Sequence, residues 1–154
     1  MSFLYLVPTG MNDPYEPGWG SWAGRYGHNE EHPGKNYYWA NQLDKWKDTT
    51  SRDNMLERWA EAFQNDFRAR MDWCIKGYGD ANHHPVAVLS GRKSPGIILI
   101  SAKSGMMVRL NAIRSFDPDG RKLIPKWFVY SEAGTYRGEI AIGGADSLKA
   151  AFKA

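Results

Sequence analysis

The chain has 154 residues, of which 42% are hydrophobic and 24% charged, and its formal net charge is +3. This composition is that of a folded globular protein and excludes a disordered or low-complexity chain. The single cysteine, Cys74, excludes an internal disulfide and a cysteine metal cluster, and no apolar run approaches the roughly 20 residues of a membrane span.

Charged and aromatic residues are distributed unevenly along the chain. Residues 1–80 carry 9 basic and 12 acidic side chains, whereas residues 81–154 carry 11 basic and 5 acidic ones. The first part also holds six of the seven tryptophans. Because the basic residues of the second part are scattered along expected strands, we do not expect nucleic-acid binding.

The first elements are a short strand and a long loop. Residues 3–7, FLYLV, form a continuous apolar run and are expected to form a buried strand. The start of the chain lacks the basic n-region of a signal peptide. Glycine and proline recur over residues 10–35, which predicts an ordered loop in place of a helix or strand.

The longest regular element is an amphipathic helix over residues 57–74, ERWAEAFQNDFRARMDWC. Thr50 and Asp53 are spaced as a capping pair before it, and Gly77 is expected to follow its end. Because Cys74 lies on the apolar face, we expect a buried, inert thiol. That face consists of Leu56, Ala60, Phe63, Phe67, Met71 and Cys74.

The pattern changes to a period of two after residue 82. Asn82-His83-His84-Pro85 is interpreted as a solvated linker, because the residue before proline is driven out of the helical region. Asp117-Pro118-Asp119-Gly120 predicts a tight turn. Strands at this spacing predict a β-sandwich, so the expected fold class is α+β. The strand candidates are residues 86–89, 97–100, 107–110, 127–130 and 139–142.

Aromatic residues of the first part are the candidates for carbohydrate binding. Their flat rings present apolar faces that match the C–H faces of sugar rings, while nearby polar groups can bind the hydroxyls. Packing of the same rings beneath the loop, as a small core, is the alternative that the sequence leaves open. The candidates are Trp19, Trp22, Tyr37, Tyr38 and Trp39.

Histidines and carboxylates offer weaker alternatives. His28 and His32 are four residues apart, which on a helix would suit zinc or copper, but the glycines and proline around them disfavour a helix. The pair His83-His84 has no further ligand at matching spacing. No cofactor is therefore expected, with calcium or a transition metal as the alternative. The loop carboxylates that could supply a glycosidase pair are Asp13, Glu16, Glu30 and Glu31.

Several long strings of the sequence resemble one family. They are residues 3–26, residues 57–74, NHHPVAVL (82–89), VRLNAIRSFDPDG (108–120) and KWFVYSEAGTYRGEIAIGGADS (126–147). These strings are similar to bacterial cellulose-binding proteins that have a nucleoside-hydrolase-like α/β domain and a C-terminal immunoglobulin-like domain. The resemblance implies a loop-rich helical unit, residues 1–81, from the end of the first domain. This unit would pack on an incomplete immunoglobulin-like sandwich, residues 82–154.

Two departures from the family pattern bear on metal binding and assembly. Asp13 matches the calcium-ligating Asp of the His-Asp-Pro step in nucleoside hydrolases, but Asn12 replaces the His and the Asp-rich calcium motif is missing. A single carboxylate cannot supply the six or more oxygens that calcium prefers. The family's last hairpin is also missing, which would leave an exposed sheet edge. We therefore expect a homodimer or larger homo-oligomer.

The resemblance implies a module that binds cellulose or another β-glucan and has no catalysis of its own. It also implies a secreted or periplasmic protein, although no signal peptide is visible in this chain. Neither nucleic acid nor a membrane is an expected partner. The first alternative is a polysaccharide-active enzyme that uses the loop carboxylates or a histidine-bound metal. The second is a fragment that keeps its fold without activity.

Overall fold

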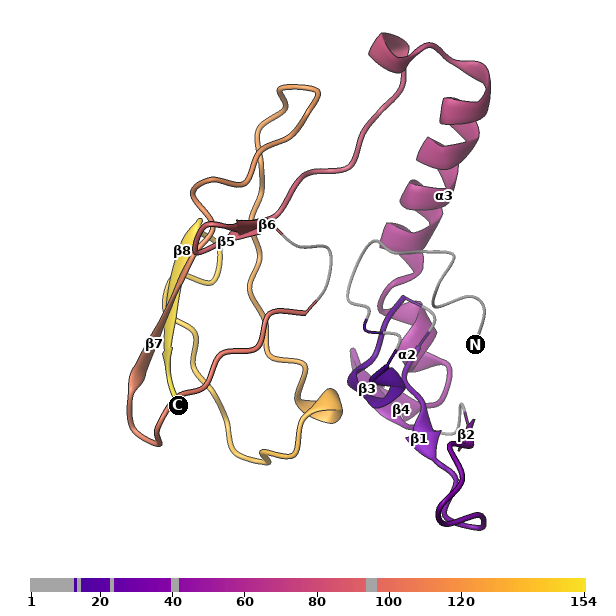
Figure 1. The fold of residues 1–154 in the computed structure, drawn as a ribbon, viewed down its shortest axis with the longest axis vertical. Coiled ribbons are helices and arrows are strands. Elements are labelled where there is room, and N and C mark those ends of the chain that lie inside the picture. Colours follow the sequence, from indigo (N-terminus) through magenta and orange to yellow (C-terminus); the bar gives the residue numbers. More distant parts are fainter. Residues whose placement is uncertain (1–12, 14, 23, 40–41, 94–96) are drawn as a thin grey trace. The chain divides into compact units, whose positions relative to one another are not determined.

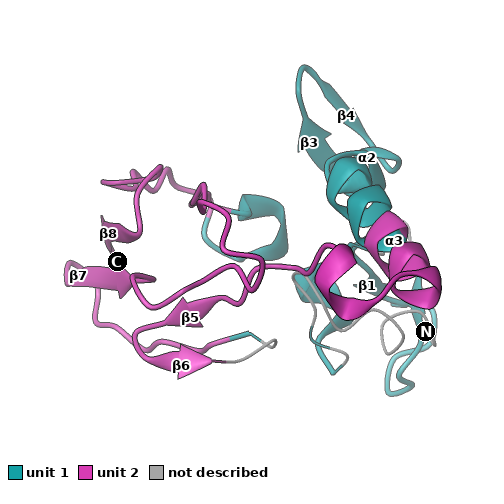
Figure 2. Cartoon of the chain, turned by 90° about the horizontal axis from the view of Figure 1, so that it is seen from above, with its two compact units in different colours: residues 1–67, 95–97, 130–136 teal, residues 68–94, 98–129, 137–154 magenta. Residues whose placement is uncertain are grey.

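The computed structural model describes residues 13, 15–22, 24–39, 42–93 and 97–154. The expected strand at residues 3–7 lies outside the described residues. The chain forms two compact units (Figure 2). Unit 1 comprises residues 1–67, 95–97 and 130–136, and unit 2 comprises residues 68–94, 98–129 and 137–154. These units do not test the predicted division at residue 82, which stays a prediction.

Unit 1 is built from short antiparallel strand pairs and the start of a helical segment (Figure 1). Its turns are tight, and Lys47, between the strands at residues 44–46 and 49–51, adopts a positive φ of 53°. The elements are a 3-10 helix Pro17–Trp19, β1 Gly27–His28 paired with β2 Tyr38–Trp39, β3 Asp44–Trp46 paired with β4 Thr49–Ser51, and α2 Asn54–Glu57. A second 3-10 helix, Ser131–Ala133, comes from far along the chain.

The predicted amphipathic helix is confirmed as α3, Ala60–Ile75, preceded by the separate turn of α2. The predicted capping pair is wrong, because Asp53 makes no side-chain cap hydrogen bond. Ser51 Oγ instead accepts a hydrogen bond from the Asn54 N–H at 3.3 Å. The helix ends before Gly77, as expected, but Gly77 has an extended conformation with a φ of −64°.

The apolar face of α3 remains largely open to solvent. Phe67 and Met71 are exposed, as is Leu56 of α2. The prediction of a buried thiol at Cys74 is wrong, because this side chain is exposed and its Sγ contacts the Arg70 carbonyl oxygen at 3.3 Å. The helical period therefore identified the face correctly but not its burial.

Unit 2 consists mainly of β-structure and turns. β5, Val88–Leu89, pairs with β6, Arg92–Lys93, and β7, Met107–Asn111, pairs with β8, Lys149–Lys153. Isolated bridges join Val86 to Phe116 and Gly143 to Ala151. Hydrogen bonds from Ser90 N–H to the Asn111 oxygen and from Ala112 N–H to the Leu148 oxygen connect these pieces. The inward face of the β7–β8 pair contributes the buried residues Val108 and Ala150.

The mixture of helix and strand confirms the α+β expectation, whereas the immunoglobulin-like sandwich stays a prediction. β5 lies within the expected segment 86–89, and β7 covers the expected segment 107–110 and extends one residue beyond it. The structure assigns no strand to residues 97–100, 127–130 or 139–142. The predicted turn at residues 117–120 is confirmed, with Gly120 at a φ of 73° and its N–H bonded to the Asp117 oxygen. No helix in the described part of the chain is long and apolar enough to span a membrane.

Candidate functional site

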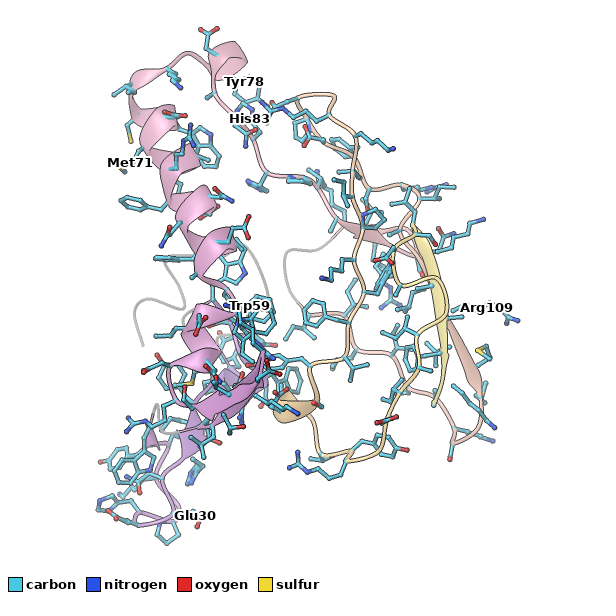
Figure 3. All side chains as sticks on the ribbon, turned by 180° about the vertical axis from the view of Figure 1, so that it is seen from behind. Glu30, Trp59, Met71, Tyr78, His83 and Arg109 are labelled. Carbon is cyan, nitrogen blue, oxygen red and sulfur yellow. The ribbon has the colours of Figure 1, made fainter. Side chains whose placement is uncertain are left out.

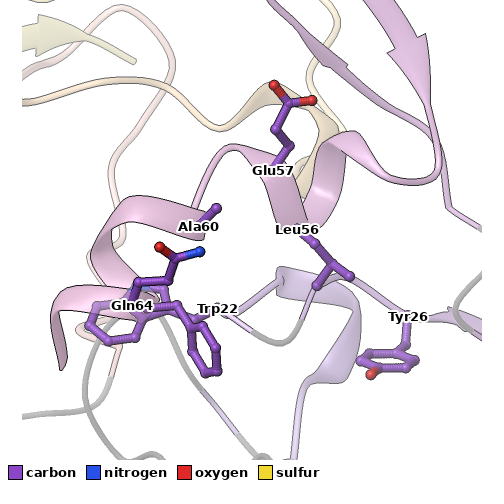
Figure 4. A pocket seen from close by; sticks show the side chains of 7 residues that line it. Trp22, Tyr26, Leu56, Glu57, Ala60 and Gln64 are labelled. Atoms are coloured by element: carbon purple, nitrogen blue, oxygen red, sulfur yellow. The ribbon is translucent and has the colours of Figure 1, made fainter. Parts of the chain in front are cut away.

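A pocket of about 530 Å³ lies within unit 1, between the loop around residues 22–26 and the start of the helical segment (Figure 4). Viewed as in Figure 4, Leu56 lies between Trp22 and Tyr26. Most of the lining is aromatic or aliphatic, and two side chains add polar groups at its edge. The lining residues are Trp22, Tyr26, Leu56, Glu57, Ala60, Phe63 and Gln64.

A tight turn holds the loop side of the pocket in place. The backbone N–H groups of Ser21 and Gly24 each donate to the other residue's oxygen at 3.0 Å, which closes a turn around Trp22. Gly24 has a φ of 95°, and an added Cβ would lie 3.3 Å from Leu56 Cδ2. Glycine thus supplies both the left-handed backbone and the close approach to α2. The Tyr26 N–H donates to the Pro17 oxygen at 3.1 Å, which fixes the end of the loop.

A buried ion-pair cluster joins the two walls of the pocket. Asp44 is 0% exposed, and its Oδ1 accepts hydrogen bonds from Arg25 Nε at 3.2 Å and Arg25 Nη2 at 2.9 Å. Its Oδ2 lies 3.4 Å from Arg58 Nη1. Arg25 directly precedes Tyr26, and Arg58 directly follows Glu57. The carboxylate therefore anchors the backbone on both sides of the pocket, and we call these three residues the Asp44 cluster.

The segment of residues 130–136, which contains the 3-10 helix Ser131–Ala133, completes this cluster from far along the sequence. The Tyr130 hydroxyl donates to Asp44 Oδ2, and Glu132 Oε1 accepts the Lys45 N–H at 3.0 Å. The Arg58 guanidinium lies 4.4 Å from the centre of the Tyr130 ring. Burial raises the pKa of Tyr130 to about 12, and its hydrogen bond to Asp44 adds to the effect. Tyr130 thus stays neutral, and its hydroxyl donates a hydrogen bond to the carboxylate over the physiological pH range.

Sequence reasoning missed this cluster and the polar edge of the pocket. Asp44 and Tyr130 are 86 residues apart, so no local spacing could connect them. Glu57 and Gln64 lie two turns apart on the helical segment. From the sequence alone, both are ordinary polar residues that are expected to face solvent. The only usable signal was the aromatic density near Trp22.

The predicted aromatic residues fall into two groups. Trp22 lines the pocket, whereas Trp19 is half-buried in the 3-10 helix and is not among the lining residues. Tyr37, Tyr38 and Trp39 lie on or beside β2 and are 54%, 37% and 39% exposed. The structure therefore does not gather all five residues on one surface.

The candidate metal ligands lie in loops and a hairpin. His28 packs edge-on against Tyr38, and His32 against Tyr37, each with ring centres 5.5 Å apart. Asp13 Oδ1 accepts the Tyr15 N–H at 3.0 Å, an ordinary local turn contact. Among the described residues, no three His, Cys, Asp or Glu side chains come together to form a metal site.

A second polar cluster lies in unit 2, near the end of α3. His83 Nδ1 lies 2.8 Å from Asp119 Oδ1, and the His83 N–H donates to Asp119 Oδ2 at 2.8 Å. These contacts, the backbone hydrogen bond first, lower the pKa of Asp119. The His83 ring stacks on Trp73 at 6.0 Å, and Trp73 Nε1 donates to the Asn82 oxygen. The interpretation of His83 (Figure 3) as a solvated linker residue is therefore wrong, because its backbone and its ring both contact Asp119 of the turn.

Comparison with known proteins gives two findings. Residues 107–154 match the family model of the cellulose-binding protein Sde0182, C-terminal domain. The chain is also similar to a solved structure, a nucleoside hydrolase-related hypothetical protein from Saccharophagus degradans that is associated with carbohydrate metabolism. The sequences are 32% identical, and the TM-score is 0.77. The match covers 99% of this chain and 38% of the other chain.

These findings confirm the family resemblance seen in the sequence strings. The matched residues 107–154 begin at β7 and end one residue after β8. The chain spans only 38% of the length of the solved relative. The comparison with curated proteins finds no match.

Proposed function

We propose that this chain binds cellulose or another β-glucan and has no catalysis of its own. The observation that carries the proposal is the pocket in unit 1, where Trp22, Tyr26 and Phe63 present aromatic surface beside polar groups. Apolar ring faces bind the C–H faces of pyranose rings, and a few polar groups then fix the orientation of the sugar. The match of residues 107–154 to a cellulose-binding protein family supports the same reading.

Two side chains at the pocket edge can bind sugar hydroxyls. Glu57 supplies carboxylate oxygens that accept hydrogen bonds, and Gln64 supplies both an acceptor and donors. Glu57 Oε1 also lies 2.9 Å from Lys47 Nζ, in a pair whose side chains are 51% and 69% exposed. Such an exposed ion pair is weak. A hydroxyl group can therefore replace Lys47 at Glu57 at little cost.

The exposed rings of the β1–β2 hairpin extend the binding surface that we propose. Tyr37 and Tyr38 each contact a histidine ring edge-on, which limits the positions that the aromatic rings can take. Rings that are ordered before binding lose little conformational entropy when a ligand binds. We therefore assign Tyr37, Tyr38 and Trp39 to contacts with a second portion of the glycan, and give Trp19 a packing role.

Binding without catalysis agrees with the lining of the pocket. Most glycoside hydrolases place two carboxyl groups on either side of the scissile bond. Within the described lining, Glu57 is the one carboxylate. The loop carboxylates Asp13, Glu16, Glu30 and Glu31 do not contribute to it. A polysaccharide-active enzyme is thus less well supported than a binding module.

The remaining family expectations are part of the proposal. We propose that residues 82–154 belong to an immunoglobulin-like sandwich, supported by the linked strand pieces around β7 and β8. We also propose a secreted or periplasmic protein that forms a homodimer or larger homo-oligomer through exposed apolar or strand-edge surface. Light scattering at micromolar concentration tests the assembly, and a monomeric mass would exclude it.

Depletion of the protein by insoluble cellulose tests the binding function. Glu57→Ala and Gln64→Ala should each weaken binding roughly 2- to 12-fold, because one hydrogen bond contributes about 0.5–1.5 kcal/mol. Tyr136→Ala is the matched control, since Tyr136 is 63% exposed in unit 1 and does not line the pocket. If all three substitutions changed binding equally, the pocket would be excluded as the binding site. Soluble sugar released from the cellulose would instead indicate an enzyme.

A further inference from the structure

The β7–β8 pair presents one basic face to solvent. In the antiparallel register Arg109 lies opposite Ala151, and Asn111 lies opposite Lys149. Successive residues of a strand point to opposite sides, so Arg109, Lys149 and Lys153 share the face opposite buried Val108. The Arg109 side chain points away from the ribbon (Figure 3). We call the three cations with Met107, Asn111 and Ala151 the outer face.

The cations of the outer face are not paired with acidic side chains in the part of the chain that the structure describes. Among the residues that the structure describes, no carboxylate forms an ion pair with Arg109, Lys149 or Lys153. Residues 81–154 carry 11 basic and 5 acidic side chains, so the surrounding unit adds to the positive potential. An anionic ligand would therefore bind here without displacing an existing ion pair.

The spacing of these cations suits a linear polyanion. Lys149 and Lys153 are four residues apart on β8, which corresponds to about 13 Å along an extended strand. Arg109 lies on the neighbouring strand at the midpoint, about 5 Å across from Ala151. A single small anion cannot bridge three charges spread in this way. A polymer with a negative charge on successive units can pair with all of them.

A hollow of about 440 Å³ accompanies the outer face. Its lining includes Arg109, Asn111, Lys149 and the Gly143–Gly144 segment. Gly144 has a φ of 74°, and a Cβ added there would lie 2.5 Å from the Lys149 oxygen. Glycine at this position allows the segment to lie close against β8. The hollow can accept part of a sugar unit beside the cations.

We propose that the outer face of β7–β8 binds an acidic polysaccharide, a linear polymer whose sugar units carry carboxylates. Proteins that bind single-stranded nucleic acid usually add aromatic rings on which the bases stack, and the other members of the outer face are Met107, Asn111 and Ala151. The choice of a polysaccharide among polyanions rests on the proposed function. The outer face shares no residue with the pocket, whose carboxylate Glu57 would repel a uronate.

Affinity electrophoresis in gels that contain polygalacturonate tests this inference. The triple variant Arg109→Ser, Lys149→Ser, Lys153→Ser should bind roughly 3- to 150-fold more weakly than the unmodified chain, as expected for three exposed ion pairs. High salt should also weaken binding by the unmodified chain. The control variant Lys122→Ser, Lys126→Ser, Arg137→Ser removes the same charge from exposed positions elsewhere in unit 2. It should keep most of the affinity.

Three results would overturn the inference. The first is that polygalacturonate does not retard the unmodified chain at low salt. The two triple variants could lose affinity equally, which would leave net charge as the only cause. Single-stranded DNA could bind more tightly than polygalacturonate, which would favour nucleic acid. A parallel gel that contains hydroxyethylcellulose, a neutral β-glucan, separates the two proposals. If hydroxyethylcellulose does not retard the unmodified chain, only the proposal of β-glucan binding fails. Retardation by polygalacturonate would still support binding at the outer face.

Discussion

Replacing Asp44 with alanine should strongly destabilise unit 1. The carboxylate is fully buried and contacts Arg25, Arg58 and the Tyr130 hydroxyl. Both guanidinium groups are also largely buried, with side chains 11% and 10% exposed. Both guanidinium groups would lose the Asp44 carboxylate, and Arg58 would keep Glu132, whose Oε1 lies 3.6 Å from its Nη2. Arg58 Nε already lacks a hydrogen-bond partner among the described residues. The substitution therefore leaves Arg25 without its buried carboxylate partner and Arg58 with one carboxylate partner in place of two.

The expected loss in the free energy of unfolding on Asp44→Ala follows from measurements on other buried ion pairs. Removing one partner of a buried ion pair typically costs about 3–5 kcal/mol in the free energy of unfolding. In a chain of 154 residues, 1 kcal/mol shifts Tm by roughly 2–4 °C. Asp44→Ala should thus lower Tm by about 6–20 °C in thermal unfolding followed by circular dichroism.

An exposed ion pair in the same unit provides the control. Lys47 and Glu57 form a pair whose side chains are 69% and 51% exposed. Lys47→Ala should cost no more than about 1 kcal/mol, because solvent screens such pairs. If Asp44→Ala changed Tm as little as Lys47→Ala does, the Asp44 cluster could not be what holds the pocket walls together.

The remaining predictions concern pH and backbone geometry. The pKa of Tyr130 is raised to about 12, so its contribution to stability is full below pH 10 and declines as the pH rises toward 12; ultraviolet titration should show one tyrosine ionising near 12 that Tyr130→Phe removes. The pKa of Asp119 is lowered by His83, so the contribution of Asp119 to stability is present above about pH 4 and declines as the pH falls through the folded pKa. In urea unfolding, Asp119→Asn should make the free energy of unfolding depend less on pH in acid. An unchanged dependence on pH would refute this prediction. Gly20→Ala should lower Tm, because Gly20 has a φ of 89° and an added Cβ would lie 2.7 Å from Tyr130 Cε1; an unchanged Tm would show that Tyr130 moves aside freely.

Local patterns predicted the regular elements more successfully than their surroundings. The 3.6-residue period identified α3, and the Asp117–Gly120 turn follows from the dihedral preferences of proline and glycine. The same period could not show that Phe67 and Met71 stay exposed. Burial depends on what packs against a helix, and a period carries no information about that partner.

The candidate site shows the same division between local and long-range information. Aromatic density pointed to Trp22, which does line the pocket. Glu57, Gln64 and the Asp44 cluster depend on contacts between distant segments, above all the approach of Tyr130 to Asp44. The sequence could not show the contact between His83 and Asp119, because the two residues are 36 positions apart. Only the three-dimensional structure brings such groups together.

Isothermal titration calorimetry with a soluble cello-oligosaccharide tests most directly the central claim that the pocket in unit 1 binds a β-glucan. The measurement compares the Kd of the unmodified chain with that of Trp22→Ala. Trp22 lines the pocket with Tyr26 and Phe63, and truncation of a central aromatic anchor costs about 2 kcal/mol. The account requires saturable binding by the unmodified chain and a Kd roughly 30-fold higher for a Trp22→Ala protein that keeps its circular dichroism spectrum. Equal Kd values, or no binding by the unmodified chain, would contradict it.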